Sequence, residues 1–387
     1  MANDAKSKPK ASAVAQGSGL QGSPARVKAL LLHIAVLFVF ALAAGAAEKK
    51  RLIEFGWDEP DTAFMRKHIF EMEKTPFDGC VYTVNYTTAN GVSGSFMKEA
   101  WGTRAFTDAE LKPALDDLRA TPFRKLTCNF LRFNVTPGNV DWFDDFSAIL
   151  QNARLAARVA RAGKSKGILF DIEHYATPLF HYRKQRDSAT KSWELYAAQS
   201  RLRGREVMTA FQAEFPEVIV FLTFGYSQPW AGSDNGKKSL ADVEYGLLAP
   251  FLDGMVEVST RRHNIIEGGE IAYSFRETNK FLRHYKVMKE NLLPIVANER
   301  KYHSAVSIGF GIWMDYDWRK KGWDARDVAK NFYTPEQFEA SVREALNVAD
   351  DYVWIYTEQA RWWTPEGKPT ALPDSYAESL QRAREFR

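Results

Sequence analysis

The chain has 387 residues, 45% of them hydrophobic and 13% aromatic, which is enough for one large domain or two ordinary ones. Its formal net charge of +4 lies entirely in residues 1–47, so the remainder is neutral overall. A neutral domain lacks the basic surface that binds nucleic acid, and such an apolar composition excludes a largely disordered protein.

Residues 1–47 have the order of an export signal. A polar stretch containing lysines is followed by the apolar run ALLLHIAVLFVFALAAGAA, which ends in small residues. The run also approaches the length of a membrane-spanning helix. We therefore expect a signal peptide or an N-terminal membrane anchor, and export to the periplasm or the extracellular space. Membrane contact is expected only through this segment, if it is not cleaved, and the sequence assigns no oligomeric state.

From residue 51 onward, short apolar runs alternate with longer amphipathic stretches. Eight runs read as strands: 51–58, 77–84, 125–133, 167–173, 218–225, 253–259, 304–315 and 352–358. Helical spacing of apolar residues marks 62–75, 145–162, 197–215, 277–292 and 334–350. Thr334 and Pro335 have the residue types of an N-cap and a first helical position.

This alternation predicts an α/β protein whose residues 48–387 form a single (β/α)8 TIM barrel. The runs are mostly apolar on both faces, as expected for strands covered by helices on one side and packed inside a barrel on the other. An open doubly wound sheet fits less well, because FGWDEPDTAF rather than a glycine-rich phosphate turn follows the first strand.

The stretch FDIEHY carries the main candidates for chemistry. Asp171 and Glu173 point to the same side of an extended strand, because side chains alternate with a period of two. Cleavage of a glycosidic bond needs two carboxyl groups, of which one is protonated, and a neighbouring negative charge raises a carboxyl pKa. The alternative is that the two acids form a structural ion-pair cluster with a barrel arginine such as Arg132.

We expect Glu173 to be the general acid, with Asp171 orienting it or raising its pKa. The partner carboxylate is expected to be Glu358 or, as second choice, Glu270. The other acids and aromatic side chains near strand ends suit hydroxyl groups and the apolar faces of sugar rings. These substrate-binding candidates are Trp57, Asp58, Tyr175, Trp230, Glu267, Trp313, Asp315, Asp317, Arg361 and Trp362.

Several candidates have a structural alternative. Glu358 would equally serve in an ion pair, Asp315 or Asp317 would cap the following loop, and Trp362 would close the barrel against the C-terminal segment. Arg261 or Arg361 would accept an acidic sugar. The insertion at residues 86–106, rich in Gly, Ser and Asn, would shape the cleft, so its removal should alter substrate-length preference more than stability.

With these motifs, residues 51–365 resemble the (β/α)8-barrel glycoside hydrolase superfamily. The resemblance implies a catalytic acid at the end of the fourth strand, where Glu173 stands. In clan A hydrolases Asn precedes this acid and a Glu on strand seven is the nucleophile; here Ile172 precedes it, and strand seven offers Asp315 and Asp317. Asp171 and Glu173 also match the end of the DxxDxDxE motif of family 18 chitinases, with Lys166 and Leu169 at its earlier acids.

The leading hypothesis is an exported glycoside hydrolase that cleaves an oligo- or polysaccharide without a cofactor or metal. One alternative is a non-catalytic carbohydrate-binding barrel. A second is a metal-dependent hydrolase or lyase that uses Asp171, Glu173, His174 and His263. No HxH, HExxH or Cys/His pattern supports such a metal site.

Overall fold

The computed structural model describes residues 50–317, 322–364 and 370–385. From Lys50 onward the chain forms one compact unit. The expected signal or anchor segment, residues 1–47, lies outside the described residues. Within the described ranges, every helix is too short or too polar to cross a membrane.

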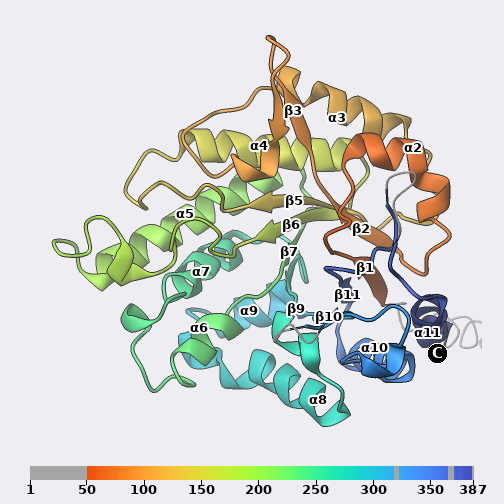
Figure 1. Ribbon diagram of the computed structural model, residues 1–387. Helices are drawn as coiled ribbons and strands as arrows, with labels where there is room; N and C mark the ends of the chain where they lie inside the picture. The colour runs from red at the N-terminus through yellow and green to blue at the C-terminus, as the bar shows by residue number, and fades with distance from the viewer. Residues whose placement is uncertain (1–49, 318–321, 365–369, 386–387) are drawn as a thin grey trace, which may run out of the picture. The chain divides into compact units, whose positions relative to one another are not determined.

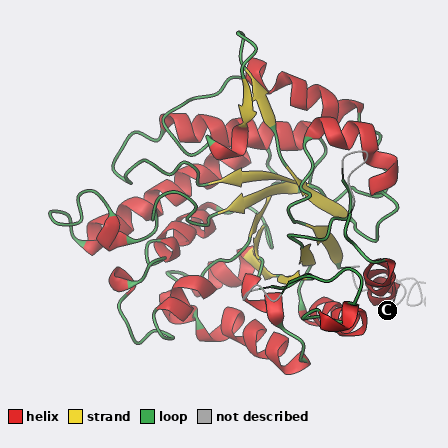
Figure 2. Cartoon of the chain, viewed as in Figure 1, coloured by secondary structure: helices red, strands yellow, loops and turns green. Residues whose placement is uncertain are grey.

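A nearly closed sheet of nine parallel strands forms the centre of the molecule, with helices around it (Figures 1 and 2). The order around the sheet is β10-β11-β1-β2-β5-β6-β7-β8-β9. The strands are β1 (Arg51–Glu54), β2 (Gly79–Tyr82), β5 (Phe130–Asn134), β6 (Gly167–Asp171), β7 (Ile219–Leu222), β8 (Ile265–Glu267), β9 (Val306–Ile308), β10 (Phe310–Trp313) and β11 (Tyr352–Tyr356). The prediction of a single TIM barrel is confirmed.

The ninth strand arises because one predicted strand is divided at Gly309. β9 pairs with β8, and β10 pairs with β11, so the two halves of this segment join the ends of the sheet. The backbone N–H of Gly309 donates to Glu267 O at 2.8 Å. A Cβ atom at this position would lie 3.0 Å from the carbonyl oxygen of Tyr352. Glycine therefore lets the strand change partners where the barrel closes.

The helices of the described residues surround the sheet. They are α2 (Thr62–Met72), α3 (Asp108–Ala120), α4 (Ser147–Ala162), α5 (Trp193–Glu214), α6 (Ser227–Gly232), α7 (Leu248–Val258), α8 (Thr278–Lys286), α9 (Glu299–Ala305), α10 (Pro335–Val348) and α11 (Asp374–Glu385). Thr334 is the N-cap of α10 and forms a capping box with Gln337. The sequence-based expectation for this helix start is therefore confirmed.

The core has two layers, which follow from the alternation of side chains along each strand. Ile53 points into the barrel, where it packs with Leu169, Phe221 and Trp354. Leu52, the neighbour of Ile53, belongs to the larger cluster that includes the apolar faces of the helices. Burying each such side chain stabilises the fold by roughly 1.5–3 kcal/mol.

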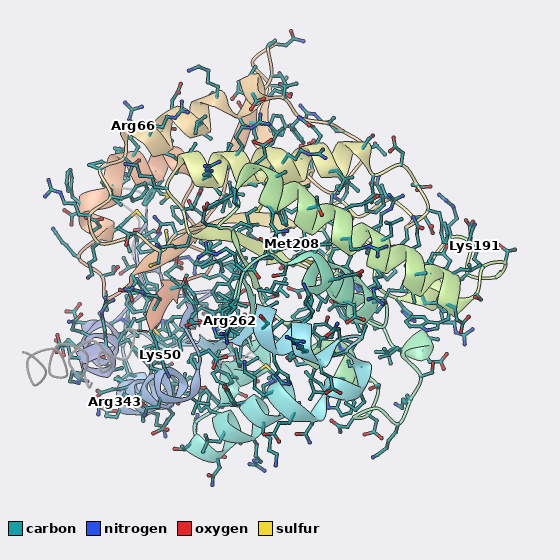
Figure 3. All side chains as sticks on the ribbon, turned by 180° about the vertical axis from the view of Figure 1, so that it is seen from behind. Lys50, Arg66, Lys191, Met208, Arg262 and Arg343 are labelled. Atoms are coloured by element: carbon teal, nitrogen blue, oxygen red, sulfur yellow. The ribbon has the colours of Figure 1, made fainter. Side chains whose placement is uncertain are left out.

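One predicted strand is wrong. Residues 253–258 belong to α7, and the sixth barrel strand is instead β8. Two glycines let α7 and α5 approach closely. A Cβ on Gly254 would lie 2.0 Å from Arg201 O, and one on Gly204 would lie 1.9 Å from Phe251 O. The loop 259–264 therefore precedes a strand, at the end of the barrel opposite to the predicted one (Arg262 is labelled in Figure 3).

The insertion at residues 86–106 starts with an antiparallel hairpin, formed by β3 (Asn85–Thr87) and β4 (Ser93–Ser95). Its second half is part of the core: Phe96, Trp101 and Phe106 are buried. Trp101 stacks on Phe170 of β6, with ring centroids 5.6 Å apart. This segment therefore contributes to packing more than the sequence indicated.

Candidate active site

A cleft of about 550 Å³ opens at the carboxyl ends of the barrel strands. Its walls come from the ends of strands all around the barrel and from the loops that follow them. The lining residues are Phe55, Gly56, Trp57, Arg132, Glu173, Tyr175, Thr223, Glu270, Ile271, Tyr273, Ser274, Trp313, Tyr316, Tyr356 and Glu358. Three carboxyl groups predicted from the sequence, those of Glu173, Glu270 and Glu358, thus line one cavity. No residue of the 86–106 insertion lines it.

A larger hollow of about 1230 Å³ lies outside the barrel, between α2 and α11. It includes Trp362 but none of the strand-end carboxyl groups. Volume alone does not identify a site, and the strand-end cleft is the one in which ionisable groups from several strands converge.

Arg132 organises one wall of the cleft. Its guanidinium pairs with Asp171 and with Glu59, each at 2.7 Å, and also donates to Asn134 Oδ1 at 3.0 Å. Asp171 is fully buried and also accepts the Tyr175 hydroxyl at 2.9 Å. Asp171 is therefore held in an ion pair with Arg132 beneath the cleft, as the structural alternative expected for this residue, whereas Glu173 lines the cleft.

Glu173 and Glu270 form a coupled pair of carboxyl groups. Glu173 follows β6 and Glu270 follows β8, and these strands flank β7. Burial, together with the negative charges of Glu173 and Asp171, raises the pKa of Glu270 to about 8. Burial and the negative charge of Asp171 also raise the pKa of Glu173, and Tyr175 and the charge of Arg132 offset only part of that rise. These environments favour a protonated Glu270 at neutral pH.

Glu358 stands on the opposite side of the cleft, because β11 and β6 are separated by three strands, β1, β2 and β5. Its loop is fixed by the buried carboxylate of Asp315. This group accepts the backbone N–H groups of Glu358, Gln359 and Ala360 and the indole N–H of Trp313. Asp315 therefore caps the loop after β11, whereas the structural alternative expected it to cap the loop that follows its own strand. The Tyr356 hydroxyl donates to Glu358 Oε1 at 3.2 Å.

Aromatic side chains cover much of the remaining cleft wall. Tyr273 and Tyr356 are stacked with centroids 5.3 Å apart, and Trp313 lies edge-on to Tyr356 at 5.5 Å. Trp57 and Tyr175 are exposed at the rim, with 67% and 54% of their surface accessible. Exposed rings beside hydrogen-bonding groups are suited to sugar rings.

The sequence did not single out Tyr273 and Tyr356 as site residues. A usable signal was present for Tyr356, because it precedes Glu358 by two positions and therefore shares its face of the strand.

Besides Asp315, six predicted substrate-binding residues lie outside the cleft lining. Glu267 is buried and caps α6, accepting Ser227 N at 2.8 Å. Trp230 is buried on α6, and Trp362 is buried edge-on to Phe77 at 4.8 Å. The other three hold loops or lie beside the rim. The Asp58 carboxylate accepts Trp362 N, Asp317 accepts Gly322 N at 3.1 Å, and Arg361 lies 6.0 Å from the Trp57 ring.

The four residues of the metal hypothesis do not come together. His174 Nε2 accepts the backbone N–H of Phe180 at 2.9 Å, and His263 precedes β8 at the amino end of the barrel. Among the residues that the structure describes, no group of three or more His, Cys, Asp or Glu side chains has a metal-binding arrangement.

No protein-family model and no curated protein matches the sequence. Solved structures with a similar course of the chain include a broad-specificity GH5-4 endoglucanase from an uncultured bacterium, with 12% identity, TM-score 0.45 and coverage of 88% of this chain and 91% of that one. A chitinase active domain from Pyrococcus furiosus has 12% identity, TM-score 0.43 and coverage of 87% and 95%. A GH10 xylanase from Thermobacillus composti has 10% identity, TM-score 0.43 and coverage of 87% and 97%. At these values the likeness assigns neither a substrate nor a catalytic residue to this chain.

Proposed function

We propose that this barrel is a glycoside hydrolase whose reacting pair is Glu270 and Glu173. The observation that carries the proposal is the convergence of these two carboxyl groups, from different strands, on one aromatic-lined cleft whose burial raises the pKa of both, that of Glu270 to about 8. Hydrolysis of a glycosidic bond requires one protonated and one ionised carboxyl group.

The protonation states suggest the role of each group. Glu270, with a pKa of about 8, holds its proton at neutral pH and would give it to the leaving oxygen. Glu173, whose pKa burial also raises and Tyr175 and Arg132 partly lower again, would be the other member of the pair and act as nucleophile or as base for a water. This proposal exchanges the roles expected from the sequence, in which Glu173 was the acid. A carboxyl separation of about 5–5.5 Å gives retention, and one of about 6.5–9.5 Å gives inversion.

The two roles can be separated with Glu270→Gln and Glu173→Gln, assayed on oligosaccharides and on aryl glycosides with good leaving groups. Loss of the acid should lower kcat/KM on oligosaccharides by about 10²–10⁴-fold, and much less on aryl glycosides, because a good leaving group needs no proton. Loss of the Glu173 carboxylate should abolish hydrolysis of both the oligosaccharides and the aryl glycosides. Glu290→Gln, at an exposed glutamate beyond α8, is the matched control.

Two results would contradict this assignment. If Glu173→Gln retains aryl glycoside hydrolysis while Glu270→Gln loses it, the roles are those expected from the sequence. If wild type cuts no glycan but binds one, the barrel is a carbohydrate-binding protein.

We also propose export through residues 1–47, and fractionation of cells that express the full chain tests it.

A further inference from the structure

The proposed reaction leaves one carboxylate of the cleft without a role. Glu358 is held on the opposite side of the cleft from Glu173, and Asp315 fixes the backbone on which it stands. Its Oε1 accepts the Tyr356 hydroxyl, and the side chain is half-buried within the cleft lining. A positioned carboxylate of this kind is an acceptor for a substrate donor.

The surroundings of Glu358 are aromatic. Trp57, Trp313, Tyr316 and Tyr356 line the cleft with it, and the indole N–H of Trp57 donates to the Tyr356 hydroxyl at 2.8 Å. Aromatic faces attract cations through the negative charge above the ring. A carboxylate bordered by aromatic rings therefore favours a positively charged group more than a neutral hydroxyl.

The arginines at the carboxyl end of the barrel do not neutralise all the carboxyl groups of the cleft. The Arg132 guanidinium is engaged by Glu59, Asp171 and Asn134, and only 14% of its side chain is exposed. Arg361 is outside the cleft lining, where it donates to Ala360 O at 3.1 Å and lies near the Trp57 ring, and its charge offsets part of the rise in the pKa of Glu358 that burial causes. Arg261, the other arginine expected to accept an acidic sugar, lies at the far end of the barrel. The cleft lining therefore holds three carboxyl groups against one largely buried guanidinium, an arrangement that disfavours acidic sugars.

We propose that the cleft accepts glycans of hexosamine units with free, protonated amino groups, and that Glu358 accepts the ammonium of one such unit. This inference rests on the proposed function, and it adds the class of sugar. The ammonium would donate to the carboxylate while the aromatic rings border the same sugar. Glu173 and Glu270 would remain available for the bond to be cleaved.

The test compares four sets of oligosaccharides at a pH at which the sugar amine is protonated: glucosamine oligomers, N-acetylglucosamine oligomers, neutral glucose oligomers and galacturonic acid oligomers. Cleavage and calorimetric binding are measured for wild type, Glu358→Gln and the control Glu290→Gln. We expect wild type to prefer glucosamine oligomers and to reject galacturonic acid oligomers. Glu358→Gln should narrow the preference for glucosamine over N-acetylglucosamine oligomers by about tenfold or more, because it removes a charge-assisted hydrogen bond.

Each outcome is decisive for one of the two proposals. Cleavage of N-acetylated or neutral oligomers with no preference for glucosamine, or a preference unchanged in Glu358→Gln, overturns the amino-sugar inference and leaves the hydrolase in place. If wild type cuts none of these oligomers and no other glycan or aryl glycoside, the proposed function fails. Glucosamine binding that wild type shows and Glu358→Gln loses then still supports the inference about the ligand. Loss of cationic binding in Glu290→Gln as well would overturn it, because the effect would be one of net charge.

Discussion

Arg132 is the residue on which the acidic side of the cleft depends. It pairs with two carboxylates, Asp171 and Glu59, whose side chains are 0% and 8% exposed. Burying these anions is costly, and the arginine offsets that cost through short ion pairs with both. The arrangement also keeps a fixed negative charge close to Glu173.

Replacing Arg132 by methionine should therefore lower the free energy of unfolding by about 3 kcal/mol, since it leaves two buried carboxylates without a cation. Urea unfolding followed by tryptophan fluorescence measures the change. The matched control is Arg183→Met, which removes the exposed pair with Asp242, with side chains 60% and 55% accessible. The control should change the free energy by less than about 1 kcal/mol. Equal effects of the two replacements would contradict the role given to Arg132.

Glu270 should make both stability and activity depend on pH. The folded protein raises its pKa from 4.5 to about 8, so between these values the folded state binds more protons than the unfolded state. The free energy of unfolding must then fall as the pH rises through this window. Glu270→Gln removes this contribution and should be more stable than wild type by on the order of 2 kcal/mol near pH 9, with no such gain near pH 4.

Urea unfolding of both proteins at several pH values checks this, and a gain independent of pH would contradict it. In the assay, activity should fall as the pH rises through about 8, because the acid loses its proton.

The sequence predicted that Glu173 lies at the cleft, but it could not show which of the two acids near β8, Glu267 or Glu270, faces the cleft. Ile266 points into the barrel, so Glu267 points outward and caps α6 instead of facing the cleft. Glu270 follows Gly268 and Gly269, and Gly269 has a φ of 61°. The direction of Glu270 thus depends on a left-handed turn and on the register of a strand that the sequence placed elsewhere.

At the scale of elements, the 86–106 insertion divides into an exposed tip and a buried base. Residues 89–93 are exposed, whereas Phe96, Trp101 and Phe106 are buried, and Asn152 of α4 donates to Ala100 O at 2.9 Å. The sequence showed the glycines and serines of the tip but not the packing of the aromatic side chains that follow.

Deleting residues 86–106 should therefore prevent cooperative folding, contrary to the expectation from the sequence, because three large core side chains are lost. Deleting only residues 89–91 should change the free energy of unfolding by less than about 1 kcal/mol, since a shorter exposed turn loses no core contact. Circular dichroism with thermal unfolding distinguishes the two variants. A stable, cooperative 86–106 deletion would show that the base is dispensable.

The error at α7 has a similar origin. Residues 253–259 contain Val256 and Val258 after Gly254, a composition typical of a short strand. Gly254 is instead the point at which α7 meets α5. A contact between two helices distant in the sequence has no local signature. The secondary structure of this segment is therefore set by tertiary packing and not by its local sequence. The true strand, β8, has only three residues and no alternating pattern.

At the scale of the whole molecule, the alternation of strands and helices was sufficient to predict the barrel. What it could not show is how the barrel closes, because closure depends on pairing between β8 and β9 and between β10 and β11. Gly309, where the partner changes, lies inside a run that reads as one continuous strand.

Substitutions at Gly309 should lower the free energy of unfolding, and the larger the new side chain, the larger the loss. Gly309→Ala places a Cβ 3.0 Å from Tyr352 O and should cost about 1 kcal/mol, and Gly309→Val should cost about 2–3 kcal/mol through overpacking against Ile266. Denaturant unfolding measures the series. Equal stability of all three proteins would mean that the strand changes partners without needing the glycine.

The start of the described chain and the cleft lie at opposite ends of the barrel. Lys50 precedes β1 at the amino ends of the strands, and the cleft opens at their carboxyl ends. A barrel that starts at Lys50 and is fixed to a bead at that residue would therefore turn its cleft toward the solution. In such a preparation a ligand lying on a second surface reaches the cleft without a change in the point of attachment.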